Sequence, residues 1–322
     1  MKELNQLYRK ILNEGEKVID RTQVGTLAIF GEQIKFNQKD GFPAVTAKKL
    51  AWKSVVSELL WFLRGSTNVN DLRALLHGEE NRFNLDKKTI WDDNYNNQGK
   101  ALGYTDGELG PVYGGQWRSR NDLVQFDWTS IDHNPQFREE LERIGYQVAG
   151  EDTSNGIWFY ERRIDQVKNL LIRAATNPEC RRMIVSAWNP AEQHLMTLPP
   201  CHYGFQIRIT GDYIDLLWTQ RSVDSFLGLP FNIASYALLQ AIFGRILGKT
   251  PRYLTGQLGD THIYLNHTEQ VLEQLSREPL PAPTLWINPD LKTLADFETA
   301  TVDDFKLVGY ESHAAIKAPM AV

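Results

Sequence analysis

The chain has 322 residues, 42% of them hydrophobic and 11% aromatic, so it is long and apolar enough to bury a large core. Its 35 basic and 40 acidic residues give a net charge of −5, which excludes the basic excess typical of nucleic-acid-binding proteins. The N-terminus is charged and no apolar run approaches about 18 residues, so we expect neither a signal peptide nor a membrane span and predict a cytoplasmic protein.

The first predicted elements are two helices and a hairpin between them. Apolar residues at helical spacing predict a helix over residues 3–14. Strand-forming residues on both sides of Gly31 and Glu32 predict a hairpin over residues 22–37. Residues 51–63 predict a second helix, which is apolar almost all round.

Glu58 is the acidic residue within that second apolar helix. We expect its carboxylate to be buried, and burial raises a carboxyl pKa, so Glu58 is a candidate for proton transfer. The alternative is an ordinary helix residue near a surface groove, or one paired with Lys53.

Residues 89–118 are rich in Gly and Asn and contain several aromatic side chains. Such residues either anchor a loop to the core or form a flat wall against which a heterocycle stacks. The aromatic residues concerned are Trp91, Tyr104, Tyr113 and Trp117.

Residues 121–163 differ from the rest because they carry nine acidic and four basic residues together with many aromatic ones. This aromatic content argues against a disordered linker. We predict an inserted subdomain or flap with a short helix near residues 135–144.

The second half of the chain mixes helices and strands without a regular βαβ rhythm, which favours an α+β fold. The Gly211-Asp212 pair predicts a tight hairpin between two of the strands. Helices are predicted over 163–175, 231–247 and 267–279, and strands over 180–189, 203–210, 213–220 and 283–289.

Residues 198–232 combine a cysteine, a histidine and several polar residues. Cys201 is an inert buried thiol, half of a disulfide with Cys180, or a nucleophile; a reducing compartment favours free thiols. His202 is not expected to be its base, because neighbouring residues on a strand face opposite ways. Arg221 is the candidate for a positive charge near the thiol.

Four arginines lie in three separate segments beside other polar residues, and together they could hold a dianionic phosphate. This site would lack a glycine-rich phosphate loop, since the sequence has no GxxxxGK or GxGxxG motif. The spacing of the histidines and cysteines also predicts no metal site. The arginines are Arg21, Arg181, Arg182 and Arg221.

Nine segments resemble the thymidylate synthase family in sequence and order. The resemblance extends from residue 20 to residue 322, with only the insert at about 121–163 outside it. It implies a single large catalytic domain over residues 1–322, with a mixed β-sheet packed by helices and one sheet face forming a homodimer interface. The segments are DRTQVGTLAIFG, SELLWFLRG, TIWDDN, GELGPVYGGQWR, CRRMIVSAWN, LPPCHYGFQ, QRSVDSFLGLPFNIASYALL, GDTHIYLNH and HAAIKAPMAV.

The activity that this resemblance implies is reductive methylation of dUMP to dTMP by 5,10-methylenetetrahydrofolate, which becomes dihydrofolate, without a metal. Cys201 would attack C6 of the uracil. Glu58 would manage proton transfers, and Tyr113 would help to remove the C5 proton. Asn232 would read the uracil edge, because an amide offers both a donor and an acceptor.

The resemblance also implies residues for the rest of the two substrates. Arg181 and Arg182 would reach the phosphate from the other subunit, where Arg21, Arg221 and Ser222 also bind. His262 and Tyr264 would bind the sugar hydroxyl. The implied folate contacts are Lys48, Ile90, Trp91, Asn94, Asp224, Leu227, Gly228, Phe231, Met320 and Ala321, the last two in a terminal segment that would close over both ligands.

Two alternatives remain for the activity. A dUMP (pyrimidine nucleotide) hydroxymethylase of the same superfamily would let water trap the intermediate. Trp91 and the terminal IKAPMAV segment favour methylation instead. Asn232 disfavours a cytidylate substrate, although a deoxyuridylate hydroxymethylase could keep it. An inactive regulatory or RNA-binding homologue is disfavoured by the acidic charge balance.

Overall fold

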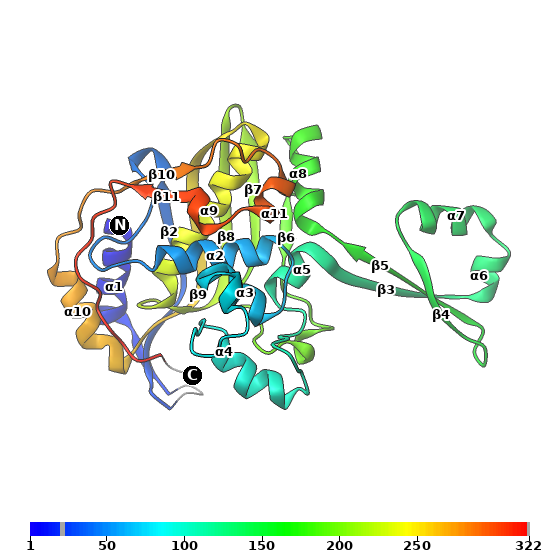
Figure 1. Cartoon of the computed structure of the whole chain (residues 1–322), viewed down its shortest axis with the longest axis horizontal. Coiled ribbons are helices and arrows are strands. Elements are labelled where there is room, and N and C mark those ends of the chain that lie inside the picture. Colours follow the sequence, from blue (N-terminus) through cyan, green and yellow to red (C-terminus); the bar gives the residue numbers. More distant parts are fainter. Residues whose placement is uncertain (20–22, 321–322) are drawn as a thin grey trace.

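Six strands form the main sheet of the computed structural model, which describes residues 1–19 and 23–320 (Figure 1). Their order is β1-β2-β9-β8-β7-β6, and only the β8–β9 pair is parallel, so the sheet is mixed. The expected α+β class is confirmed. The strands are β1 (Glu16–Val18), β2 (Thr26–Asn37), β6 (Ile184–Ser186), β7 (His202–Thr210), β8 (Tyr213–Asp224) and β9 (Thr250–Tyr264).

Helices cover one face of this sheet, and α9 (Gly228–Leu247) is the central one. It packs on β8 and β9 on one side and on α2 (Trp52–Leu63) on the other, which explains why it is apolar all round. The other helices are α1 (Lys2–Glu14), α3 (Val69–His77), α4 (Asp92–Asn94), α5 (Tyr113–Ser119), α8 (Gln166–Thr176), α10 (Thr268–Ser276) and α11 (Leu294–Thr299). In the described part of the chain no helix is long and apolar enough to cross a membrane.

The hairpin expected around Gly31 is wrong, because β2 is one continuous strand. It pairs with β9 in the same register on both sides of this glycine, from Thr26↔Tyr264 to Asn37↔Tyr253. Gly31 takes a φ of 84°, which a residue without a Cβ accommodates inside a strand. The long partner strand β9, which the sequence patterns did not reveal, therefore overrides the local turn signal.

The hairpin at Gly211 is confirmed by the antiparallel β7–β8 pair, with β8 continuing to Asp224. The strand expected over 180–189 is wrong in extent, since only Ile184–Ser186 is β6 and Arg181 and Arg182 lie in the preceding loop. The helix expected from residue 163 begins later, because Arg163 belongs to a strand that pairs with Asn121.

Asn232 does not lie at the start of its helix, because α9 begins at Gly228. The Asp224 carboxylate accepts hydrogen bonds from the backbone N–H groups of Phe226 and Leu227, and so organises the turn that enters the helix earlier. Pro230 is tolerated there, since the first helical turn needs no internal donors.

The acidic insert folds as an arm that projects from the body (Figure 1). A three-stranded sheet carries two helices, and its own apolar cluster contains Ile131, Leu141, Tyr146 and Tyr160. The helix expected near 135–144 is confirmed. The arm consists of β3 (Arg120–Asp127), α6 (Trp128–Asp132), α7 (Pro135–Arg143), β4 (Gln147–Asp152) and β5 (Ile157–Ile164). A small two-stranded antiparallel sheet of β10 (Thr284–Ile287) and β11 (Phe305–Val308) completes the fold.

Candidate active site

Cys201 lies between a Pro-Pro pair and the first residue of β7, and it is a free thiol. Its backbone N–H donates to the Tyr113 hydroxyl over 2.8 Å. The Arg221 guanidinium donates to the carbonyls of Pro199 and Pro200 over 2.9 and 3.0 Å and lies 4.0 Å from the Cys201 sulfur. Arg221 therefore holds the turn that presents the thiol and puts a positive charge beside it.

Burial raises the pKa of the Cys201 thiol, and the Arg221 charge opposes part of that rise. The expected basic group is present as Arg221, but burial affects the Cys201 pKa more strongly than the Arg221 charge does. The resting group is therefore a neutral thiol at neutral pH. The nucleophilic thiolate forms only when this proton is lost, and the neighbouring Arg221 charge favours that loss.

Glu58 is buried in α2, with 6% of its surface exposed. The indole N–H of Trp91 donates to its carboxylate over 2.8 Å. Burial raises the pKa of Glu58 to about 7, while the hydrogen bond from Trp91 lowers it. Among the described residues Lys53 makes no ion pair with it, so Glu58 is a carboxyl group that can take up or release a proton near neutrality.

Tyr113 connects the cysteine to the aromatic wall of the site. Its ring stacks on Phe62 with centroids 4.9 Å apart and lies 4.4 Å from the ring of His202. Burial, followed by the Cys201 charge, raises the Tyr113 pKa well above its ordinary value. The hydroxyl is therefore protonated and can relay a proton rather than act as a phenolate.

His202 has a buried ring whose Nδ1 lies 2.9 Å from the Tyr236 hydroxyl. Burial lowers the His202 pKa to about 3, so the ring is uncharged and is a poor base at neutral pH. This agrees with its exclusion as a partner of Cys201. Tyr236 was missed by the sequence patterns; the only signal was a tyrosine within a mostly apolar helix.

Asn232 points its amide oxygen at a second residue that the sequence patterns missed. The Gln220 amide donates to Asn232 over 3.1 Å and to the Ser222 carbonyl over 3.1 Å. Trp218 in turn donates to the Gln220 oxygen over 3.3 Å. This buried chain fixes which way the Asn232 amide faces, and a fixed amide is what reading a heterocycle edge requires.

The expected sugar-binding residues lie at the end of β9, next to the phosphate-binding candidates of β8. His262 pairs with Asp224 across the sheet, and Ser222 pairs with Asp260. The His262 Nδ1 lies 2.7 Å from an Asp260 carboxylate oxygen, which orients the ring. The rings of His262 and Tyr264 are 5.1 Å apart.

The folate-binding candidates of α9 surround the Asp224 turn. Leu227, Gly228 and Phe231 are half-buried there. Lys48 donates to the Phe226 carbonyl over 2.5 Å, and its ammonium lies 3.4 Å from the Phe226 ring centroid. Burial lowers the Lys48 pKa to about 7, and the Asp224 charge opposes this shift.

The structure does not bring every candidate together. Arg181 lies beside Gln206, whose amide donates to its carbonyl over 3.3 Å, and this point is about 16 Å along β7 from Cys201. Arg182 lies in the same loop, so within one chain this pair is remote from Arg221.

Two of the remaining folate candidates are exposed at the surface. Ile90 is 52% and Met320 50% exposed, and Asn94 ends the short helix α4. The terminal segment is held by His267, whose Nε2 lies 2.6 Å from the Pro319 carbonyl. Arg21 and Ala321 lie outside the described residues. Within residues 1–19 and 23–320 no His, Cys, Asp or Glu cluster is arranged to hold a metal ion.

Comparisons with known proteins agree over the whole chain. A family model described as thymidylate synthase matches residues 2–322. The chain is 46% identical over 323 residues to a probable thymidylate synthase of Escherichia phage T5, covering 98% of this chain and 99% of that protein. It is 43% identical over 331 residues to the thymidylate synthase of Enterobacteria phage T4, covering 100% of both. The crystal structure of thymidylate synthase from T4 phage matches with a TM-score of 0.81 at 42% identity, again over 100% of both chains.

Proposed function

The chain belongs to the thymidylate synthase family and is a methyltransferase enzyme, and on this basis we propose that it converts dUMP to dTMP. The donor would be 5,10-methylenetetrahydrofolate, which supplies the one-carbon group and the hydride and leaves as dihydrofolate. The observation that carries the proposal is that one site holds a thiol flanked by Arg221 and Tyr113 and, on α2, a carboxyl group that titrates near neutrality.

Cys201 would begin the reaction by adding its thiolate to C6 of the uracil. The C5–C6 π electrons then move toward C5 and O4, and C5 becomes a carbon nucleophile. The Asn232 amide, fixed by Gln220, would hydrogen-bond to N3–H and O4 and so favour uracil over cytosine. Covalent addition divides a difficult substitution into feasible steps.

Proton transfer would fall to Glu58 and Tyr113. Once C5 carries its new carbon substituent, the C5 proton must leave before the thiol can depart. The neutral Tyr113 hydroxyl, which already contacts the Cys201 backbone, would relay this proton. Glu58, with a pKa of about 7, would exchange protons with O4.

The residues around the Asp224 turn fit a folate. Half-buried Leu227 and Phe231 offer apolar surface for a flat ring, and the adjacent carboxylate of Asp224 can accept from a pterin N–H. Lys48 lies behind this turn as a candidate for the anionic tail of the ligand. Ile90, Trp91, Asn94, Met320 and Ala321 would complete the folate site.

The phosphate would be held by Arg21, Arg221 and Ser222, together with Arg181 and Arg182 of a second subunit. Their distance from Cys201 within one chain supports an origin across a homodimer interface. The sheet face opposite the helices also supports this assembly, because it exposes Ile184 and Tyr253.

A single assay tests the reaction. The protein is incubated with dUMP and 5,10-methylenetetrahydrofolate, dihydrofolate formation is followed, and the nucleotide product is identified. We expect dTMP and dihydrofolate in equal amounts. A hydroxymethylated nucleotide with tetrahydrofolate would show a hydroxymethylase instead. If neither nucleotide product formed, the protein would be an inactive homologue.

A further inference from the structure

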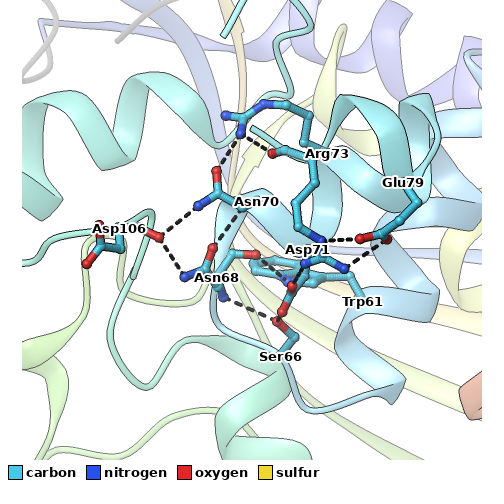
Figure 2. Close-up of polar contacts among 9 residues, drawn as sticks. Trp61, Ser66, Asn68, Asn70, Asp71, Arg73, Glu79 and Asp106 are labelled. Atoms are coloured by element: carbon cyan, nitrogen blue, oxygen red, sulfur yellow. Dashed lines mark hydrogen bonds and ion pairs between the residues drawn. The ribbon is translucent and has the colours of Figure 1, made fainter. Parts of the chain in front are cut away.

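Arg73 is an almost fully buried arginine, 1% exposed, that belongs to none of the groups described above. It lies on α3, and its guanidinium donates in several directions. Nη1 donates to the Asn70 side chain over 2.5 Å and to the Arg82 carbonyl over 2.9 Å, and Nε donates to the Lys87 carbonyl over 3.1 Å. Figure 2 shows this guanidinium directed at Asn70. The remaining nitrogen, Nη2, forms an ion pair with Asp92.

Asp92 is also buried, at 4% exposed, and uses both carboxylate oxygens. One oxygen meets Arg73, and the other accepts from the backbone N–H and the hydroxyl of Thr89 over 2.6 and 2.9 Å. The Thr89 hydroxyl in turn accepts from the backbone N–H of Trp91 over 3.2 Å. Residues 89–92 are therefore a closed turn whose shape depends on the Arg73–Asp92 pair.

Trp91 is the residue that this turn carries into the site. Its ring packs 5.5 Å from that of Trp61 and 5.9 Å from that of Tyr113, and its N–H donates to Glu58. A buried ion pair adds little stability compared with apolar residues of the same size, because both charges lose their hydration. What the pair does supply is a defined position for the indole.

The N-terminal end of α3 is fixed on its other side to the segment that leads to Tyr113. The side-chain amides of Asn68 and Asn70 both donate to the Asp106 carbonyl over 2.8 Å (Figure 2), and the Val69 N–H donates to the Gly107 carbonyl over 2.8 Å. Helix α3 therefore contacts both the turn that carries Trp91 and the segment that precedes Tyr113.

We propose that Arg73 and Asp92 are positioning residues for the proton-transfer group: their ion pair fixes residues 89–92 so that the Trp91 indole stays hydrogen-bonded to Glu58. This inference rests on the proposed function, in which Glu58 transfers protons. It assigns a role in the reaction to two residues that touch neither substrate.

Within residues 1–19 and 23–320, two tyrosines are the titratable groups that interact with the Glu58 charge. Tyr113 and Tyr236 interact with its charge, and the pKa of each is raised by burial, so both are neutral around pH 7. The Trp91 hydrogen bond favours the ionised carboxylate and lowers the Glu58 pKa. Loss of that bond must therefore raise the Glu58 pKa further and move the corresponding limb of a pH profile to higher pH.

The test compares Arg73→Met with Arg82→Met. Arg82 is a matched control because it is an arginine near the same turn, but its side chain pairs with Glu79 and Asp71 at the surface rather than with Asp92. For Arg73→Met we expect kcat to fall about tenfold or more, the Kd of dUMP to change less than about threefold, and the Glu58 pKa to rise by about one unit. For Arg82→Met we expect none of these changes.

The Glu58 pKa is read from the carboxyl signal of ¹³C-labelled glutamate in the ligand-free protein, assigned by its absence in Glu58→Gln. A rise in Arg73→Met but not in Arg82→Met supports the inference even if the wild-type protein forms no dTMP, so failure of the proposed function is recognised separately. An unchanged Glu58 pKa in Arg73→Met overturns the inference, whether or not kcat falls.

The Arg73→Met variant leaves Asp92 buried without its partner and risks misfolding. The double variant Arg73→Met, Asp92→Leu removes both charges and keeps an apolar filling. We expect it to fold and to show the same rise in the Glu58 pKa, because the Thr89 hydrogen bonds to residue 92 are lost. A folded double variant with the wild-type Glu58 pKa would also overturn the inference.

Discussion

The pKa values of acidic groups are shifted in opposite directions in the site around Cys201 and in the acidic arm. In the site, burial raises the pKa values of Cys201, Glu58 and Tyr113, and few partners offset that desolvation. In the arm, hydrogen bonds lower the pKa values of Asp127 and Asp152 to about 2. The arm satisfies its charges by itself, whereas the site holds groups that only a ligand or a proton can satisfy, which is typical of catalytic centres.

The two regions also differ in how they are packed. The site is part of the main core, since Phe62, Tyr113 and Trp91 belong to the same apolar cluster as α9. The arm has a separate cluster and leaves the body through the paired strands β3 and β5. Arg118 secures their base, donating to both oxygens of Asp165 and to Glu298. Changes in the site should therefore affect activity, and changes in the arm should remain local.

The largest effect is expected from Cys201→Ala. Removing the sulfur removes the proposed nucleophile for C6, so turnover should fall at least about 10⁴-fold. The alanine leaves Arg221 bound to the carbonyls of Pro199 and Pro200, so dUMP binding, measured by calorimetry, should persist. Cys180→Ala is the matched control and should keep full activity. Appreciable turnover by Cys201→Ala would exclude the covalent mechanism.

Glu58→Gln should lower kcat about 10²- to 10³-fold and at the same time stabilise the folded protein at alkaline pH. The Glu58 pKa is raised to about 7, so between about pH 4.5 and pH 7 the native protein binds a proton that the unfolded chain has lost. Wild-type stability must therefore fall as pH rises through this window. The glutamine variant lacks this loss and should gain about 2–3 kcal/mol relative to wild type between pH 5 and pH 8.

Urea unfolding at the two pH values measures this gain. Glu140→Gln is the matched control in the arm, because Glu140 is an exposed partner of Arg143 and its pKa is lowered rather than raised. It should show no stabilisation at pH 8. If Glu58→Gln also gained nothing, the burial of an unpaired carboxyl group in α2 would not cost the protein stability, and the comparison between site and arm would fail.

The sequence predicts the framework of the site better than its internal connections. The hairpin β7–β8 and helix α2 follow from local turn residues and apolar patterns, so they were predictable. The unbroken strand β2 was not, because its pairing with β9 joins residues more than 200 positions apart. Local patterns carry no information on such pairings.

The same limit applies to the polar contacts. Glu58 was a candidate because it lies in an apolar helix, but its bond to Trp91, 33 residues away, needed the structure. Gln220 orients Asn232 from a strand position at which a glutamine is ordinary. No sequence pattern singled out Arg73, yet backbone carbonyls of Arg82 and Lys87 accept from its buried guanidinium.

A smaller effect is expected from Asp122→Asn in the arm. Asp122 accepts from Arg162 over 2.8 Å and from the Tyr146 hydroxyl over 2.6 Å, and these partners lower its pKa although burial opposes them. The variant should lose about 1 kcal/mol of stability at neutral pH, because the pair is partly exposed. Because the Asp122 pKa is lowered, the stabilisation by this carboxylate is present above about pH 4 and is lost as the pH falls through the folded-state pKa. Wild type and Asp122→Asn should therefore have the same free energy of unfolding in acid.

Activity should not change in Asp122→Asn, which the dUMP assay checks. Equal unfolding midpoints of variant and wild type at neutral pH would show that the Asp122 contacts contribute nothing. A fall in kcat/KM with unchanged stability would show instead that the arm communicates with the site, against the separation of the two apolar clusters.

The smallest effect on catalysis is expected from removing the arm. Asn121 and Arg163 are paired across β3 and β5, so an Asn-Gly turn can replace residues 122–162 and preserve the hairpin geometry below it. Arg118 keeps its contacts with Asp165 and Glu298 in the deletion variant. The deleted residues include the separate apolar cluster of Ile131, Leu141, Tyr146 and Tyr160, so we expect the main core to stay covered. We expect kcat/KM to stay within about threefold of wild type, since no residue of the candidate site is touched. Sedimentation and the dUMP assay on the same sample distinguish two ways in which this expectation could fail. A loss of subunit association would place the arm at an interface. A loss of activity in an intact assembly would require the arm to stabilise the site directly.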